Sequence, residues 1–520
     1  MWRFALYRSW RQPLKSLFAI SGFLLASCAL VLLSATTQTA AVQANQSIDQ
    51  NWRPAYDLVV LPPGTKLPTN QPIPPDYMER FAGGISFAQY ETIKRISGID
   101  VAAPVAYVGY MSLPQPNIYF GQQDPRPGYY QLDWTTTASN GQHTIVEAQQ
   151  HQVIFLGPEL CEAEQKVVDQ LRQSGVIGMA CLHAGDVVYF YPPQTGHYLL
   201  AAIDPDAEDR LMHLGKSITQ GRMFTAQDTL QDDQRLKQWK NYSRDGTYLP
   251  TQAIPLLVHE QLPGQIQIQA HFTYLASDDL SFQQVLKHGG AHYLQQQPHQ
   301  KTEYVGLVPA IYNNPQNLAG ASMRWDGQHW QTALADPKNP YQMGQLMVNF
   351  SQPLAPGNLS YQPTTGPNGQ AAYSLVPTGT LGPEATFRKL QPLKTTHTQM
   401  TDILYSYNVV GAFSDSAVTP QFSNPLNWLP ENTYTVAPTT VRYDAHGRPV
   451  APTKLIPTTN SLGSLIQPPL ALTTLDAARQ LRPGNTISAI RIRVAGVENA
   501  SDASWQRVQQ VATQIQQRTH

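Results

Sequence analysis

Apolar and polar positions near the N-terminal end of the chain follow the pattern of a strand–helix–strand unit. The segment PAYDLVVLPPG predicts a short strand over Tyr56–Val60 that ends at a Pro-Pro-Gly breaker. Ser86 occupies a helix N-cap position and is followed three residues later by glutamine, which is the pattern of a capping box. Tyr90, Ile93 and Ile96 then recur on one helical face, and VAAPVAYVGYMSL predicts the next strand.

The C-terminal end of the chain has the pattern of a strand followed by a helix. In TISAIRIRVAGV, apolar residues alternate with Arg491 and Arg493, which places the two arginines on the opposite face of a strand. The next segment predicts a helix with an apolar stripe of Trp505, Val508, Val511 and Ile515. We expect 38–114 and 481–520 to be the two halves of one small ferredoxin-like α/β unit, with its last strand missing.

Residues 115–480 are predicted to be a mostly-β insertion between these halves, which makes the predicted fold class α+β. Helices are expected within it at Glu159–Gly175 and, on a charge-rich pattern, at 225–244. The Pro-, Gly- and Thr-rich stretch 351–395 is expected to be irregular. The strand-like runs are 151–157, 185–191, 197–203, 251–259, 264–275, 302–310 and 433–443.

Residues 1–37 predict a membrane anchor. Residues 1–15 are basic and contain no acid, and 16–37 contain no charge, which is long enough to cross roughly 30 Å of hydrocarbon. Because basic residues stay cytoplasmic, we expect a single-pass protein of the cell membrane with a cytoplasmic N-terminus and an extracytoplasmic bulk. Cleavage as a signal peptide near Ala41–Ala44 and lipidation at Cys28 are the alternatives; the length of the apolar stretch, which continues after Cys28, favours the uncleaved anchor.

Composition narrows the possible partners and the chemistry. Charged residues make up 14% of the chain, well below the roughly 25% of an average domain, and the net charge is −1, so nucleic acid is not an expected partner. Of the 3 cysteines, Cys161 and Cys181 belong to the extracytoplasmic part. An oxidising compartment permits a disulfide there, closing a loop of about twenty residues. We favour this bridge over two separate buried thiols.

The sequence contains no catalytic motif that supports an enzymatic function. It has no P-loop, no G-x-S-x-G and no H-E-x-x-H. His288 and His292 lack a third metal ligand at a suitable spacing, and VHE offers His259 and Glu260 alone. The acids of Asp204–Arg210 do not follow the spacing of an EF-hand loop and are interpreted as a solvated helix start. We therefore expect no enzymatic activity, no metal and no cofactor.

Four segments resemble the extracytoplasmic core of FtsX/MacB-type ABC transporter permeases, in the variety found in Gram-positive bacteria. These segments are NWRPAYDLVVLPPG, ISFAQYETIKRISGIDVAAPVAYVGYM, LLAAIDPDAEDRLMHLGKSITQGRMF and ISAIRIRVAGVENASDASWQRVQQVATQIQQRT, which cover both ends and the middle of the chain. The resemblance implies a porter-like α/β part carrying a variable insertion, and no ATPase site in the chain itself. It implies that the partners are an ABC ATPase subunit and companion permease helices or a second permease chain. It also implies a possible homodimer.

Such permeases couple ATP hydrolysis by the partner subunit to export or to mechanical work outside the membrane, on lipoproteins, peptides, antibiotics or a cell-wall hydrolase. In the family, one more strand and three more membrane helices follow the last helix, and this sequence does not contain them. We therefore expect a split or truncated permease, with an accessory subunit as the alternative. The sequence does not indicate the transported substrate.

Two further classes of function compete with the permease interpretation. In a stand-alone membrane-anchored binding protein, Tyr129, Tyr130 and Trp134 would form an exposed platform for a peptide or glycan. Burial in a sheet core is the favoured interpretation of these aromatic residues. A secreted hydrolase is disfavoured because the sequence offers no nucleophile–base pair.

Overall fold

The computed structural model describes Ser21 and most of the chain from residue 52 onward. The described residues are Ser21, 52–67, 72–74, 76–81, 83–112, 118–120, 127–181, 189–190, 198–233, 251–260, 267–297, 304–308, 322–325, 330–333, 347–350, 354–381, 384–392, 404–416, 418, 431, 433–436, 439–444, 446–458 and 460–519. They form a mixed structure of helices and sheets, consistent with the predicted α+β class. No helix among these residues is both long and apolar enough to span a membrane, and the predicted anchor over 16–37 lies outside them apart from Ser21.

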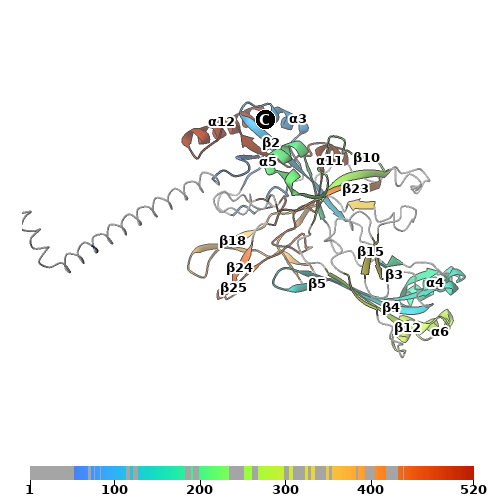
Figure 1. Cartoon of the computed structure of the whole chain (residues 1–520). Helices are drawn as coiled ribbons and strands as arrows, with labels where there is room; N and C mark the ends of the chain where they lie inside the picture. The colour runs from blue at the N-terminus through green and yellow to red at the C-terminus, as the bar shows by residue number, and fades with distance from the viewer. Residues whose placement is uncertain are drawn as a thin grey trace, which may run out of the picture.

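A ten-stranded sheet organises the upper part of the molecule in Figure 1. Its path is β1 (Leu58–Val60), β27 (Ala489–Val494), β2 (Ile99–Ser112), β16 (Met347–Phe350), β23 (Leu404–Phe413), β11 (Thr251–His259), β26 (Ala471–Thr474) and β8 (Tyr198–Ile203), with β9 (Ile218–Gly221) beside β23 and β10 (Gln231–Asp232) beside β11. Strand β8 also pairs with β2, so the strands from β2 to β8 form a closed ring. Val105 of β2 lies opposite Ala489 of β27 on one side and opposite Ile203 of β8 on the other.

The two ends of the described chain meet in this sheet. Strand β27 lies between β1 and β2 and is antiparallel to both. Helices α3 (Phe87–Lys94) and α12 (Asp502–Arg518) pack against the same face of these strands, and Figure 1 shows them side by side. The predicted capping box of α3 is confirmed, because Ser86 Oγ accepts a hydrogen bond from the Gln89 amide at 3.1 Å while Gln89 Oε1 accepts one from the Ser86 amide at 2.9 Å.

The predicted apolar stripe of α12 is correct for three residues and wrong for Trp505. Val508, Val511 and Ile515 are buried, whereas the Trp505 side chain is 63% exposed. Ser504 is buried instead, because it lies four residues before Val508 and seven before Val511, which places it on the same helix face, whereas position 505 lies off that face.

The described residues of β2, β8, β26 and β27 are almost all buried, so both faces of these strands contribute to apolar cores. The first core contains Ile490 of β27 together with residues of α3, α12 and α11 (Leu475–Leu481). The second core contains Ala489 of β27 together with residues of α5 (Pro205–Met212) and η2 (Leu214–Ser217). Because successive side chains of a strand point to opposite faces, Arg491 projects from β27 toward the second core.

A five-stranded sheet forms a separate outer lobe at the lower right of Figure 1. Its order is β13 (Tyr304–Val308), β12 (Gln267–Ser277), β4 (Gly128–Ser139), β5 (Thr144–Gly157) and β6 (Val176–Cys181), and its helices are η1 (Pro158–Cys161), α4 (Gln165–Gln173), α6 (Phe282–Lys287) and α7 (Ala291–Gln295). The helix predicted at Glu159–Gly175 is therefore shorter than expected. Pro158 begins a separate 3-10 turn that ends at Cys161, and the α-helix starts at Gln165.

Several short strand pairs surround these two sheets. The expectation of irregular structure at 351–395 was wrong, because turns such as the one closed by the hydrogen bond from Gly366 N to Gln370 O at 2.8 Å support hairpins. The pairs in this stretch are β17 (Leu354–Pro356) with β22 (Leu390–Pro392), β18 (Tyr361–Thr365) with β19 (Ala371–Leu375), and β20 (Gly379–Leu381) with β21 (Glu384–Thr386). The remaining strands are the pair β24 (Thr440–Tyr443) and β25 (Pro449–Lys454), and a sheet of β15 (Trp330–Ala333), β14 (Ser322–Trp325), β3 (Ile118–Phe120) and β7 (Tyr189–Phe190).

Candidate functional site

A buried charge cluster, defined as Arg491, Glu208 and Glu431, joins three segments that are far apart in the sequence. All three side chains are fully buried. Arg491 Nη1 donates to Glu431 Oε1 at 2.8 Å, and Arg491 Nη2 donates to Glu208 Oε2. The cluster therefore ties β27 to helix α5 and to the segment that contains Glu431.

Local sequence explains how Glu208 reaches this position. Helix α5 begins at Pro205, after Asp204, whose side chain accepts a hydrogen bond from the Ala207 amide at 3.1 Å. Counted from that start, Glu208 lies on the same face as Leu211 and Met212, three and four residues later, and all three are buried against the second core.

Burial sets the protonation of the cluster. It raises the pKa of the Glu208 carboxyl, and the nearby Arg491 opposes this shift only in part. Burial also disfavours the charged form of Arg491, but the two glutamates more than offset it and raise the pKa of the guanidinium. One cation thus faces two acids in a site without water access, which favours the neutral form of Glu208.

Tyrosines enclose the cluster on the side of the second core. Burial, followed by the neighbouring glutamates, raises the pKa of Tyr56 and of Tyr434 well above the usual range. Burial raises the pKa of Tyr77 in the same way. These hydroxyls stay protonated at any physiological pH. The arrangement can hold elements together and can keep a proton.

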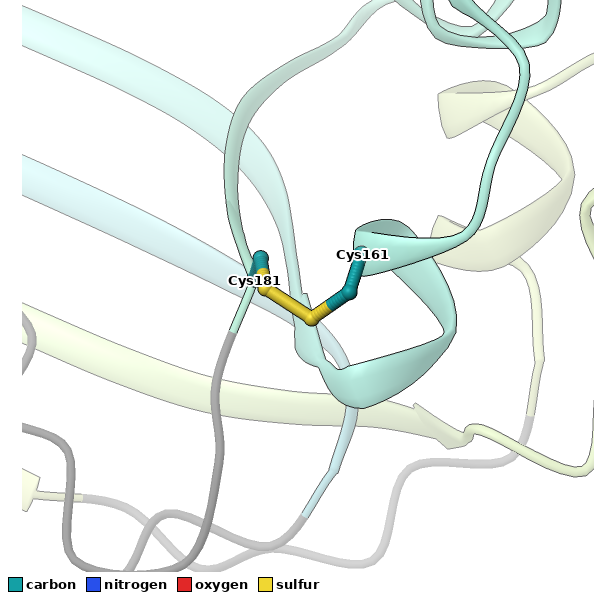
Figure 2. Close-up of a disulfide and its surroundings, with 2 residues drawn as sticks. All are labelled: Cys161 and Cys181. Atoms are coloured by element: carbon teal, nitrogen blue, oxygen red, sulfur yellow. A yellow bond between two sulfur atoms is a disulfide. The ribbon is translucent and has the colours of Figure 1, made fainter.

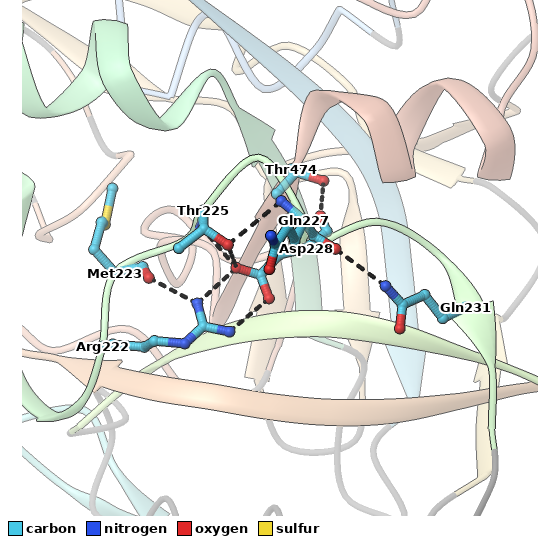
Figure 3. A network of polar contacts seen from close by, with 7 residues as sticks. All are labelled: Arg222, Met223, Thr225, Gln227, Asp228, Gln231 and Thr474. Atoms are coloured by element: carbon cyan, nitrogen blue, oxygen red, sulfur yellow. Dashed lines mark hydrogen bonds and ion pairs between the residues drawn. The ribbon is translucent and has the colours of Figure 1, made fainter.

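A second polar network lies where β9 leads into β10 (Figure 3). Arg222 donates to both carboxylate oxygens of Asp228 at 2.6 and 2.8 Å, and the Thr225 amide donates to the same carboxylate at 2.7 Å. These bonds lower the pKa of Asp228 to about 2, the hydrogen bond with Arg222 being the largest cause. Thr474, the N-cap of α11, donates to the Asp228 carbonyl oxygen at 2.9 Å, so the network also positions α11.

This network also corrects a prediction. The helix expected at 225–244 does not form in its described part, 225–233. Asp228 closes a turn on Thr225, and β10 then pairs with β11. Residues 234–244 lie outside the described residues.

The predicted disulfide between Cys161 and Cys181 is present (Figure 2). The two Cα atoms are 5.0 Å apart, within the normal range for a bridge, and the two residues are 20 positions apart in the sequence. The bond joins the end of η1 to the end of β6 and closes a loop that contains α4. It stabilises the outer lobe by constraining this loop.

The histidines named from the sequence do not converge on a metal. His288 Nδ1 lies 2.8 Å from the Gln284 carbonyl oxygen, and His288 stacks on Tyr293. His259 is buried and packs edge-on against Phe413. Across the described part of the chain, no group of three or more His, Cys, Asp or Glu side chains could hold a metal ion.

The acids of Asp204–Arg210 form a helix start, as expected, but the interpretation of a fully solvated start was wrong for Glu208. Asp206 and Asp209 are exposed, and Asp204 caps the helix while accepting from the Tyr90 hydroxyl at 2.8 Å. Glu208 alone turns inward, because its spacing to Leu211 and Met212 places it on the core face.

The aromatic residues considered as a binding platform are buried in the outer lobe. Tyr129, Tyr130 and Trp134 are all at most 4% exposed. Tyr129 packs on Phe155, and Tyr130 stacks on Phe272 with ring centroids 4.4 Å apart. Tyr129 belongs to the apolar core of the outer lobe, and none of the three is exposed enough to form a platform for a ligand.

Sequence reasoning missed both the buried charge cluster and the surface grooves. The available signal for the cluster was an arginine inside an apolar strand and a glutamate on the apolar face of α5.

A groove of about 440 Å³ lies between the β4–β5 turn and 455–465, where Thr458 Oγ1 donates to the Glu384 carboxylate at 2.8 Å. A smaller groove contains two cations, Lys66 and Arg80.

Comparisons with protein-family models, with curated proteins and with solved structures found no match to this chain. The function is therefore argued from the residues and the fold.

Proposed function

We propose that the chain is the non-catalytic, membrane-anchored outer part of an ABC transporter permease of the FtsX/MacB type. In this proposal it couples ATP hydrolysis by a partner subunit to export or mechanical work outside the membrane. The observation that supports it most is the position of β27 between β1 and β2, antiparallel to both, which is the arrangement expected if the two halves belong to one split ferredoxin-like unit.

Polar contacts fasten the two halves of this unit where they meet. Arg53 donates to the carbonyl oxygens of Val494 and Val497, each at 2.6 Å, and forms an ion pair with Asp57. Asp57 in turn accepts a hydrogen bond from the Val494 amide at 2.7 Å. A displacement of the segment before β1 would therefore be passed directly to β27.

The buried charge cluster extends the same junction into the rest of the molecule. Arg491 of β27 holds α5, and α5 follows β8 of the ring. The outer lobe and the short strand pairs lie beyond this junction in Figure 1. A stiff junction with a large attached body suits a part that transmits motion, because packed elements move as rigid units.

The proposed partners are an ABC ATPase subunit and companion permease helices or a second permease chain. The test is purification of the tagged full chain from membranes of its native cell in mild detergent, with identification of the retained proteins. We expect a subunit with a P-loop, and an ATP-dependent change in the protease sensitivity of the outer lobe. Recovery of the chain without any ATPase, and an unchanged protease pattern, would contradict the proposal.

A matched pair of variants tests the junction itself. Asp57→Asn weakens the contacts to Arg53 and Val494, whereas Asp444→Asn removes an ion pair of the same sequence spacing, with Arg448 in the β24–β25 hairpin. We expect both variants to retain the ATPase subunit. Only Asp57→Asn should lose the ATP-dependent change in the outer lobe.

The alternative is a stand-alone membrane-anchored binding or accessory protein. One observation favours it, namely the groove that contains Lys66 and Arg80, which offers charge to a ligand without any help from a second chain. Under this alternative, the full chain is recovered from the membrane fraction without an ATPase.

A further inference from the structure

The groove between the β1-to-α3 connection and the start of β18 carries an inference that goes beyond the proposed function. We name it the cationic groove; it has a volume of about 290 Å³ and is lined by Lys66, Leu67, Pro72, Pro74, Arg80, Asn358, Leu359 and Tyr361. We propose that the cationic groove binds an anionic amphiphile, meaning a small molecule with a carboxylate or phosphate group joined to an apolar chain.

Arg80 supplies a positive charge that no acid in the lining neutralises. Its Nη1 donates to Asn358 Oδ1 at 3.0 Å, and its guanidinium lies over the Phe81 ring at 4.7 Å. Its Nε is buried and has no hydrogen-bond partner. Burial lowers the pKa of Arg80 and Asp76 opposes this shift, so the guanidinium is partly desolvated.

The nearest acid is already engaged elsewhere. Asp76 acts on Arg80 electrostatically, but it forms a buried ion pair with Arg388. Arg388 also donates to the Gly463 carbonyl oxygen at 3.1 Å, which keeps this pair in place. Lys66 is exposed and, within the described residues, has no ion-pair partner. The lining therefore carries two cations and no carboxylate, which selects against a cationic ligand and favours an anion.

The other polar side chains of the groove are suited to donate hydrogen bonds. Asn358 Oδ1 is used by Arg80, which leaves the Asn358 amide nitrogen as a donor. Burial raises the pKa of Tyr361, so its hydroxyl keeps its proton. Arginine and lysine side chains are the usual partners of carboxylate and phosphate oxygens, and charge-assisted hydrogen bonds are the strongest that such a site makes.

The apolar part of the lining explains why we propose an amphiphile rather than a bare anion. Leu67 is 38% exposed, and Pro72, Pro74 and Leu359 continue the same wall. An alkyl chain would remove this apolar surface from water, which inorganic phosphate cannot do. The volume is close to the lower limit of roughly 300 Å³ for small-molecule pockets, so it suits a head group and the first carbons of a chain.

The experiment is calorimetric titration of the full chain with dodecyl phosphate below its micelle concentration, with inorganic phosphate and dodecyl maltoside as comparison ligands. We expect saturable binding of dodecyl phosphate and at least about tenfold weaker binding of the other two. Arg80→Met should weaken the binding of dodecyl phosphate by about tenfold or more, since it removes a charged donor. Arg442→Met, at an exposed arginine of β24, is the matched control and should leave the binding unchanged.

A second variant keeps the test valid if Arg80→Met disturbs folding. Leu67→Glu adds a negative charge at an exposed position of the groove and leaves the contacts of Arg80 to Asn358 and Phe81 intact. We expect it to abolish binding while the unfolding temperature stays unchanged. The proposal would be overturned if dodecyl phosphate did not bind the native chain, or if inorganic phosphate bound as tightly as dodecyl phosphate. It would also be overturned if both groove variants bound dodecyl phosphate as tightly as the native chain.

A vesicle experiment distinguishes a free amphiphile from a lipid in a bilayer. Vesicles of phosphatidylglycerol and of phosphatidylcholine are compared for binding by the native chain and by Leu67→Glu. Binding to phosphatidylglycerol alone, lost in Leu67→Glu, identifies a bilayer lipid as the source; binding of dodecyl phosphate without vesicle binding identifies a free molecule. Both outcomes support the proposal, and neither depends on whether an ATPase subunit is recovered with the chain.

Discussion

Arg491→Met is the most direct test of the junction around β27. Methionine has a length similar to that of the aliphatic part of arginine, so the substitution keeps much of the packing. It removes the cation that faces Glu208 and Glu431, both of which are fully buried. Removing one partner of a buried ion pair typically costs about 3–5 kcal/mol, because a charge is left without compensation. Each 1 kcal/mol shifts the unfolding temperature by about 2–4 °C in a domain of roughly 200 residues, so we expect a fall of roughly 10 °C.

The pH dependence of this loss follows from Glu208. Burial already raises the pKa of this carboxyl, and Arg491→Met removes the cation that opposes the shift, so its pKa in the folded state lies further above that in the unfolded chain. Such groups stabilise the fold below the unfolded pKa, and this contribution is lost as the pH rises toward the folded pKa. The difference in unfolding temperature between the native chain and the variant should therefore be small near pH 4.5 and grow toward pH 8.

The assay is thermal unfolding of the full chain, followed by circular dichroism at a series of pH values. Arg493→Met is the matched control, because Arg493 lies on the same strand but is only partly buried and makes one 3.5 Å contact with the Ala55 carbonyl oxygen. Combining Arg491→Met with Glu208→Gln and Glu431→Gln should recover part of the stability and remove the pH dependence. Equal unfolding temperatures for Arg491→Met and Arg493→Met at pH 8 would refute the reasoning.

Three further predictions concern other parts of the molecule. Reduction of the Cys161–Cys181 bridge should destabilise the outer lobe by about 3 kcal/mol, seen as a lower unfolding temperature in dithiothreitol that a double serine variant no longer shows. Asp228→Asn should destabilise the chain by roughly 1–2 kcal/mol at pH 7. Since the pKa of Asp228 in the folded state is depressed to about 2, this difference in stability from the native chain should vanish as the pH falls from about 4 to 2. A difference that stays constant with pH would contradict the prediction. Val511→Ala should lower the free energy of unfolding by roughly 2 kcal/mol because Val511 is buried, whereas Trp505→Ala at the exposed position should change it by less than about 0.5 kcal/mol. Urea unfolding measures both values, and the reverse order would show that α12 packs through its other face.

Local pattern was sufficient wherever a single element explains the fold. The capping box at Ser86 and the strand at Thr251–His259 agree with prediction because caps and continuous apolar runs act within a few residues. The Cys161–Cys181 bridge was also predictable, since only two of the three cysteines lie outside the predicted anchor and they can form only one pairing. Stretches rich in turn residues were misjudged: 351–395 contains hairpins whose strands are too short to leave a clear periodicity.

Only the tertiary structure decided which charges are buried and where unpaired cations meet. Arg491 alternates with apolar residues as an ordinary half-exposed strand residue does, and only the position of β27 between β1 and β2, against the second core, makes it fully buried. Glu208 and Glu431 are 223 positions apart in the sequence (431 − 208), so no local pattern predicts that they share one guanidinium. The sequence also does not predict that Lys66 and Arg80 lie in one groove beside Asn358, because a groove forms between segments that only the fold brings together. Nor does the position of a charged residue in the sequence indicate which neighbours will neutralise its charge.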